Sequence, residues 1–146
     1  MHSLHRTSSR RVRGNRGAAA VEFALVFPML LLTVFGAIEF STLLYDQAII
    51  TNASREAARA GVMFSTPAVT TTKIQQVATN YCQNRLVTYG ASATCTFPTA
   101  ITTCASTGNQ LSVQVSYVFN GLVLGPLLAP FIGPFTLNAT TTMLCE

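Results

Sequence analysis

A long uncharged hydrophobic run, placed directly behind an arginine-rich N-terminus, constrains this chain more than any other feature. Residues 23–38 contain no charged side chain, and apolar residues extend the run back to Ala18 and forward, past Glu39, to Phe40. A helix that crosses a bilayer needs about 20 largely apolar residues, at a rise of about 1.5 Å per residue. Residues 18–40 supply that length and predict a single transmembrane helix.

The distribution of charge along the chain predicts the orientation of this helix. Residues 1–17 carry five arginines and no acidic residue, whereas residues 18–146 carry four basic and five acidic residues. A nucleic-acid-binding domain clusters basic residues over one folded face, so this pattern argues against nucleic acid as a partner. The positive-inside rule predicts a cytoplasmic N-terminus, with the residues after about Tyr45 on the other side of the membrane.

Glu22 lies inside the apolar segment, where a carboxylate costs about 2.5–3.5 kcal/mol on insertion scales. A plain anchor or a cleaved secretory signal is the simpler interpretation, but it would avoid this cost, and no A-x-A cleavage site follows the run. If the chain is cut after Gly17, the new α-ammonium of Ala18 lies four residues from Glu22, on the same helix face. The amine can then neutralise the carboxylate within one chain or between neighbouring copies, and a negative charge in the first turn suits the helix dipole.

Several short motifs are spaced along this helix as in one known family. They are Arg16-Gly17, Val21-Glu22-Phe23-Ala24-Leu25, Pro28, Phe35-Gly36, Glu39-Phe40, Asn52 and Arg55-Glu56-Ala57-Ala58-Arg59-Ala60-Gly61. Over about residues 16–62 the chain resembles the TadE-like proteins of the tight-adherence (Flp) type IV pilus system.

The resemblance implies a minor pilin or pseudopilin that takes part in pilus assembly. It implies cleavage between Gly17 and Ala18 by a dedicated prepilin peptidase, which removes a leader of residues 1–17. It also implies that Glu22 guides subunit packing, with Phe23 and Pro28 beside it. The expected partners are the inner membrane, the prepilin peptidase, other pilin or pseudopilin subunits and the pilus assembly platform.

Beyond the membrane the helix is expected to continue as a stem. Residues 41–60 contain no proline or glycine, so the helix is predicted over residues 18–61, a length of about 66 Å. Gly61 is a candidate C-cap. The residues expected to make contacts along the stem are Glu39, Arg55, Glu56 and Arg59. Arg55 and Arg59 are like charges at i,i+4 that could bind acidic groups on another subunit, or simply form a solvated face.

Residues 62–146 predict a small exported α+β domain, in which one helix packs on a short antiparallel sheet. Helical spacing of apolar residues predicts a helix over residues 72–87, with an N-cap among the threonines at 70–72. Alternating patterns predict strands over residues 111–119 and 135–143, and a third strand is suggested over residues 93–97. The overall fold class is therefore a long N-terminal transmembrane helix followed by this α+β domain.

All the cysteines lie in the exported domain: Cys82, Cys95, Cys104 and Cys145. An even number of cysteines in an oxidising compartment predicts disulfides. Three pairings are possible, and closeness in sequence favours Cys95–Cys104, which leaves Cys82 for Cys145. Zinc is the alternative, but no histidine or C-x2-C pair supports a metal site there.

Residues 120–134 form an apolar stretch whose many glycines and prolines exclude a spanning helix. If this stretch is exposed, it is a contact for a partner or for the bilayer. It is as readily expected to fold back over the core of the domain.

The exported domain offers no catalytic machinery. It contains no histidine and no aspartate, and its one glutamate is the C-terminal Glu146. We therefore expect no enzymatic activity, no catalytic residue, no cofactor and no small-molecule substrate. Two classes remain: a pilin-like structural subunit of the bacterial inner membrane and pilus, or a single-span anchored exported adhesin or envelope accessory protein. The first requires cleavage after Gly17 and lateral assembly, and the second requires neither.

Overall fold

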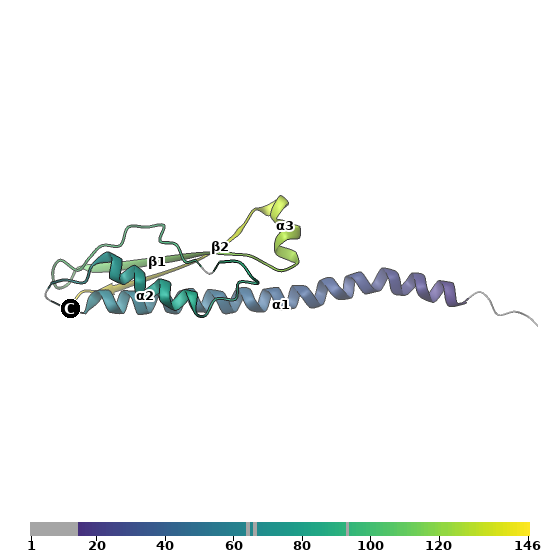
Figure 1. Cartoon of the computed structure of the whole chain (residues 1–146), viewed down its shortest axis with the longest axis horizontal. Coiled ribbons are helices and arrows are strands. Elements are labelled where there is room, and N and C mark those ends of the chain that lie inside the picture. Colours follow the sequence, from purple (N-terminus) through teal and green to yellow (C-terminus); the bar gives the residue numbers. More distant parts are fainter. Residues whose placement is uncertain (1–14, 64, 66, 93) are drawn as a thin grey trace, which may run out of the picture. The chain divides into compact units, whose positions relative to one another are not determined.

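The computed structural model describes residues 15–63, 65, 67–92 and 94–146, so residues 1–14 of the predicted leader lie outside the described part. The element order is α1 (Asn15–Val62), α2 (Thr71–Gln83), β1 (Gln110–Phe119), α3 (Leu124–Ile132) and β2 (Phe135–Leu144) (Figure 1). A long N-terminal apolar helix followed by a helix and a two-stranded antiparallel sheet confirms the predicted α+β class. The chain divides into two units, residues 1–34 and residues 35–146, and α1 contributes to both.

The described part of the first unit is the N-terminal portion of α1. By length and composition, α1 is long and apolar enough from Gly17 to Val62 to cross a membrane. Phe23 and Phe27 stack with their ring centroids 5.1 Å apart. Pro28 lies inside the helix, which continues through it, although its ring removes one backbone hydrogen bond.

The second unit is organised around the β1–β2 hairpin. Gln110 pairs with Leu144 at one end, and Phe119 pairs with Phe135 at the other, where the connection through α3 begins. Side chains of β1 alternate between more buried and more exposed positions, as expected for a strand with one face on a core, except at Ser116, which is also buried. The strands predicted over residues 111–119 and 135–143 are confirmed, each with one additional residue.

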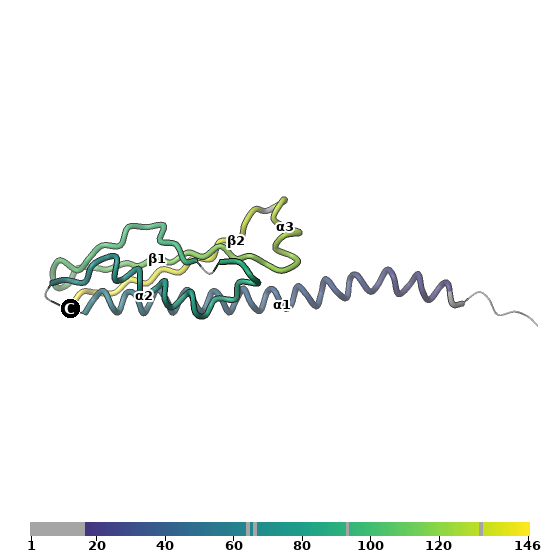
Figure 2. Tube along the Cα trace, viewed as in Figure 1, coloured from purple at the N-terminus to yellow at the C-terminus, as the bar shows by residue number. Residues whose placement is uncertain are grey.

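Two helices cover the buried face of the hairpin. The C-terminal part of α1, α2 and the hairpin lie side by side within the second unit (Figures 1 and 2). The fully buried apolar side chains of the two helices are short or of moderate size: Ile50, Ala53, Ala57 and Ala58 from α1, and Ile74, Ala78 and Cys82 from α2. Small residues let the helices approach closely, and burial of these apolar groups stabilises the core at about 25 cal/mol per Å².

Gly61 lies inside α1, which ends one residue later, so the prediction that Gly61 caps this helix is wrong. The structure assigns the glycine a packing role instead. A Cβ atom at this position would lie 2.5 Å from Leu111 Cδ2 and 2.8 Å from Ile74 Cδ1. The end of α1 therefore approaches both β1 and α2 more closely than a side chain would allow.

The second helix begins as predicted but ends early. Thr70 is its N-cap, and the Thr70 hydroxyl accepts a hydrogen bond from the Lys73 N–H at 3.4 Å. The helix ends at Gln83 rather than at residue 87, because the chain turns at Asn84 and the Val87 N–H is taken by a side chain of α1. Continuing the helical spacing to residue 87 could not anticipate that competing acceptor.

The strand suggested over residues 93–97 does not form among the described residues 94–97. An isolated antiparallel bridge joins Thr96 to Ser116 of β1 instead. Pro98 follows two residues later and has no N–H with which to extend the pairing.

The four cysteines form two disulfides, as predicted, but the favoured pairing is wrong. The bonds join Cys82 to Cys95 and Cys104 to Cys145. The bridge at Thr96 holds the neighbouring Cys95 near the sheet, where the buried face of α2 presents Cys82. Backbone hydrogen bonds also hold the end of β2 against residues 108–109, just after the segment that contains Cys104. Proximity in space therefore overrides closeness in sequence.

Candidate functional site

The predicted processing junction lies on an exposed helical segment. Gly17 and Ala18 belong to the first turn of α1, and Glu22 follows about 6 Å along the axis. All three residues are exposed. Residues four apart share a helix face, so an amine on Ala18 and the Glu22 carboxylate would face the same side.

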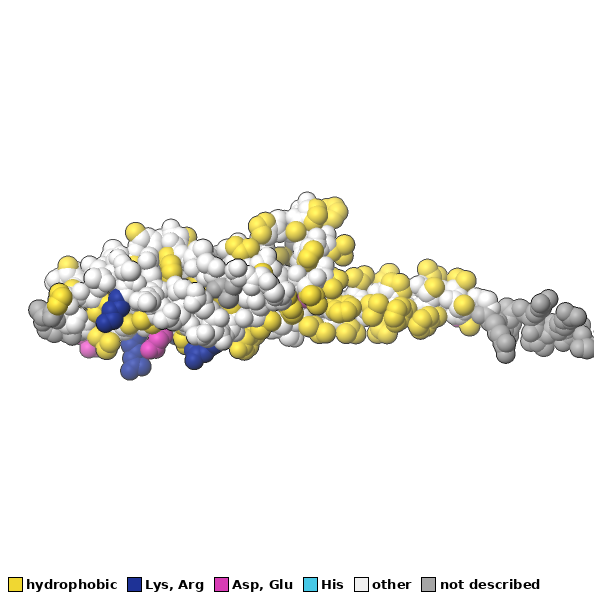
Figure 3. Space-filling view, viewed as in Figure 1, with side chains coloured by type: hydrophobic (Ala, Val, Ile, Leu, Met, Phe, Trp, Pro, Cys, Tyr) yellow, Lys and Arg dark blue, Asp and Glu magenta, His cyan; other side chains and the backbone are white. Residues whose placement is uncertain are grey.

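The helix surface beyond Glu22 is apolar and exposed. Hydrophobic side chains dominate the N-terminal portion of α1 in Figure 3. The exposed large residues on the first unit include Val21, Phe23, Leu25, Val26, Met29, Leu30 and Val34. A patch of this kind requires a lipid or protein environment. The segment is therefore compatible with a single-pass membrane anchor.

The charged stem residues near the end of α1 take no part in the core. Arg55, Glu56 and Arg59 are exposed, while Ala53 and Ala57 on the opposite side of the same turns are buried. The structure thus separates these three residues from Glu39, with which they were grouped in sequence.

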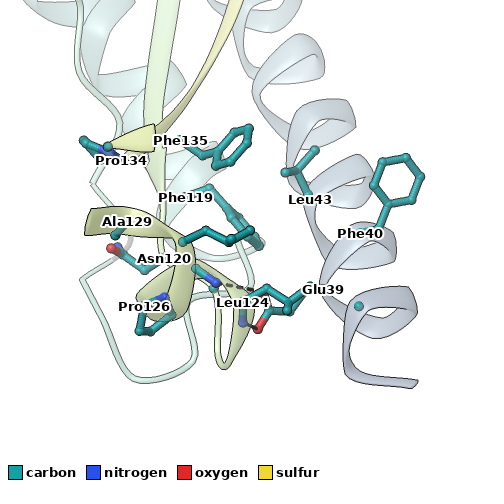
Figure 4. Close-up of a pocket in the computed structure, with 15 residues that line it drawn as sticks. Glu39, Phe40, Leu43, Phe119, Asn120, Leu124, Pro126, Ala129, Pro134 and Phe135 are labelled. Atoms are coloured by element: carbon teal, nitrogen blue, oxygen red, sulfur yellow. Dashed lines mark hydrogen bonds between the residues drawn. The ribbon is translucent and has the colours of Figure 1, made fainter. Parts of the chain in front are cut away.

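Glu39 has a partner within its own chain. It is only 5% exposed. Its Oε1 accepts the N–H of Leu124 at 2.8 Å, and its Oε2 accepts the N–H of Gly125 at 3.2 Å (Figure 4). Oε1 also accepts the N–H of Val123. These donors are at the start of α3, where N–H groups have no partner inside the helix and the Val123 side chain makes no cap. A carboxylate from α1 therefore caps α3 and complements its dipole.

A tight backbone turn accommodates this carboxylate. A Cβ atom on Gly121 would lie 2.6 Å from Glu39 Oε2 and 2.8 Å from the Gly125 nitrogen. Any larger residue at position 121 would thus displace the carboxylate from its donors. The sequence shows that residues 120–134 are rich in glycine, but it does not show that Gly121 makes room for Glu39.

A cavity of about 420 Å³ lies beside this capped turn. Its walls come from α1, the end of β1, α3 and the start of β2, and they include Phe40, Leu43, Phe119, Leu124 and Phe135 (Figure 4). Among its lining residues only Glu39 is charged, and that carboxylate is already occupied by three N–H groups. The cavity is therefore suited to apolar contact and not to acid–base chemistry.

Asp46 is a second buried acid, and sequence reasoning missed it. It is fully buried, and its Oδ1 accepts the Val87 N–H at 2.9 Å. Its Oδ2 and the hydroxyl of Tyr117 have no hydrogen-bond partner among the described residues. Burial raises the pKa of Asp46, an effect that the Val87 hydrogen bond partly offsets. Burial also raises the pKa of Tyr117, and the negative charge of Asp46 adds to that effect.

The helical spacing of the buried residues on α1 could have predicted that Asp46 is buried. Ile50 and Ala53 are buried on α1, and Asp46 precedes Ile50 by four residues on the same face. Neither Asp46 nor Tyr117 lines the apolar cavity. Their burial consequently points to a structural role.

Comparison with protein families supports the resemblance that the motifs along α1 indicate. Residues 17–59 match the model of the family described as TadE-like protein, which confirms the family resemblance of this segment. No curated protein and no solved structure matches the chain. The family match indicates a role in the tight-adherence pilus system. A membrane and pilin subunits are compatible with such a role as partners. Such pilus-associated proteins are generally not enzymes.

Proposed function

We propose that this TadE-like chain is a minor pilin or pseudopilin that takes part in assembly of the tight-adherence pilus. The observation that carries the proposal is the exposed apolar surface of α1, in which Glu22 lies one turn beyond Ala18. Prepilin peptidase would cut between Gly17 and Ala18. The resulting amine would neutralise Glu22 in its own chain or in a neighbouring subunit.

Cleavage would change the electrostatics of the whole chain. The full chain has a formal net charge of +4, and five arginines lie in residues 1–17, so the mature chain would carry −1. The arginines would serve to orient the precursor and would then be discarded. What remains is an almost neutral subunit, which is suited to close packing beside other subunits.

The proposed topology puts the N-terminus in the cytoplasm and residues 62–146 in the periplasm or outside the cell. The two disulfides support this placement, because disulfides persist in oxidising compartments. Neighbouring pilins and the assembly platform would contact the apolar surface of α1, including Phe23 and Pro28. Exposed Arg55, Glu56 and Arg59 would be available to polar groups of the same partners.

Intact-mass measurement of the full-length chain, expressed with and without the prepilin peptidase, tests the proposal. We expect loss of residues 1–17 only when the peptidase is present. Gly17→Ala should block this loss, and Glu22→Ala should permit it while reducing incorporation into pili. Glu146→Ala, at an exposed glutamate of the second unit to which no partner contact is assigned, is the control and should leave both processing and incorporation unchanged.

Two results would contradict the proposal. A mature N-terminus other than Ala18 would refute the cleavage site. A chain that stays uncut beside an active peptidase and still supports adhesion would favour an anchored adhesin or envelope accessory protein.

A further inference from the structure

We propose that α3 is a membrane-docking element, which inserts its exposed apolar side chains into the outer interface of the bilayer that α1 spans. This proposal rests on the membrane anchor in the proposed function. It assigns a lipid contact to the segment that joins the two strands, well outside residues 17–59 that match the family model.

The first observation is that α3 is apolar on the side that the second unit leaves uncovered. Its sequence, LGPLLAPFI, contains no polar or charged side chain. Phe131 is 84% exposed and Leu127 is 54% exposed. Figure 3 shows hydrophobic side chains over the projecting part of the second unit where Figure 1 places α3. An interfacial helix buries such a face about 5–10 Å into the boundary between headgroups and acyl chains.

The second observation is the level at which α3 is fixed along α1. Glu39 directly follows the uncharged run of residues 23–38, and it binds the first N–H groups of α3. Leu124 also contacts α1 at Gly36, where an added Cβ atom would lie 3.3 Å from Leu124 Cδ1. Gly36 lies about 4.5 Å further into the predicted span than Glu39. The start of α3 is therefore held at the end of the predicted span.

The third observation is the direction of the hairpin along α1. Gln47 donates a side-chain hydrogen bond to the Asn138 carbonyl oxygen at 3.0 Å. Further along α1, the hydroxyl of Ser54 hydrogen-bonds to the Thr141 hydroxyl at 2.7 Å. Residue numbers on α1 thus increase as β2 runs away from α3, so the α3 end of the hairpin lies beside the start of the α1 portion that belongs to the second unit. The opposite end, at Leu144, lies about 30 Å away along a ten-residue strand.

These three observations favour lipid over a second copy of the chain as the occupant. Every copy holds α3 at the membrane boundary through contacts within its own chain, whether or not the copy is assembled. Residues 120–134 contain no lysine or arginine, so the contact would come from apolar burial and not from attraction to anionic headgroups. Docking of α3 would fix the orientation of the second unit over the bilayer before assembly.

The chain contains no tryptophan, so single tryptophans can report on lipid contact. We would reconstitute the full-length Phe131→Trp variant in phosphatidylcholine vesicles that contain brominated acyl chains. Leu144→Trp is the matched control, because Leu144 is also apolar and 62% exposed but lies at the far end of the hairpin. Phe27→Trp, in the first unit, reports insertion of the anchor itself.

We expect Phe131→Trp to show blue-shifted emission and to be quenched several-fold more strongly than Leu144→Trp, regardless of added anionic lipid. Equal quenching of Phe131→Trp and Leu144→Trp, with Phe27→Trp quenched, would overturn the docking proposal alone. Shielding of Phe131→Trp from an aqueous quencher without quenching by lipid would overturn it in favour of a second copy. Absence of quenching at Phe27→Trp would overturn the membrane anchor, and α3 docking with it.

Discussion

Oε1 of Glu39 accepts the backbone N–H of Leu124 at 2.8 Å, and this hydrogen bond joins residues that are 85 positions apart. It connects α1, at the end of the predicted membrane segment, to the first turn of α3. A carboxylate in this position is costly unless it is paired or fully hydrogen-bonded, and three N–H groups meet that requirement. Within this chain Glu39 therefore acts as a helix cap supplied by another helix.

Replacing Glu39 should loosen α3. Glu39→Ala leaves the N–H groups of residues 123–125 without their acceptor, and hydrogen bonds to charged groups contribute about 1.5–3 kcal/mol each. Water can hydrogen-bond to the freed N–H groups and offsets part of this loss. We therefore expect the free energy of unfolding to fall by about 2 kcal/mol. Amide exchange at residues 123–125 should accelerate. The exposed Glu56→Ala is the control, and unchanged exchange in Glu39→Ala would contradict the capping role.

Gly61→Ala should destabilise the second unit although alanine is the better helix former. The helix preference for alanine over glycine is about 1 kcal/mol. The new Cβ atom would lie 2.5 Å from Leu111 Cδ2, and overpacking of this kind costs about 1–3 kcal/mol. We expect a lower denaturant midpoint. Leu111→Val removes the nearer of the two clashing atoms, so the double variant should lose less stability than the sum of the single variants. Strict additivity would argue against the contact.

The two disulfides should differ in their contribution to stability. They close loops with sequence separations of 13 and 41 residues. Loop-closure entropy predicts about 3 kcal/mol for the bond between Cys82 and Cys95, and about 4 kcal/mol for the bond between Cys104 and Cys145. Paired serine variants, compared by chemical denaturation, should follow that order. Non-reducing peptide mapping should recover these two links, and a peptide that joins Cys95 to Cys104 would refute the observed pairing.

Asp46 should make the stability of the second unit depend on pH. Since burial raises the pKa of Asp46 above its ordinary value of 3.8, the folded chain binds this proton more tightly than the unfolded chain does. Its stabilising contribution is complete below about pH 3.8 and is lost as the pH rises through the higher folded-state pKa. Asp46→Asn keeps an oxygen for the Val87 N–H without a charge, so it should flatten this decline and raise stability at neutral pH.

Unfolding curves across that pH range measure the effect of Asp46. Glu56→Gln changes an exposed carboxylate on the same helix and should leave the pH profile unaltered. If Asp46→Asn showed the same decline as the unaltered chain, another group would have to be responsible.

The local pattern of apolar and polar residues was sufficient to predict the main helices and strands of this fold. The uncharged run of residues 23–38 specified the apolar helix, because length and hydropathy are properties of a contiguous segment. Alternation in residues 111–119 specified a strand, and the threonines at 70–72 marked the start of α2, for the same reason. Glycine and proline in residues 120–134 excluded a spanning helix, but they did not exclude the nine-residue α3. The first N–H groups of α3 are hydrogen-bonded to the distant Glu39 carboxylate.

The amino-acid sequence by itself determined the long apolar helix, the concentration of arginine in residues 1–17 and the main secondary structure. Tertiary structure alone decided which cysteines pair, why Gly61 has no side chain, which N–H groups Glu39 binds and that Asp46 is enclosed. Each of these depends on groups 13 or more residues apart that become neighbours only in the folded chain. Periodicity reports which face of an element is buried, but not which distant atom meets it there.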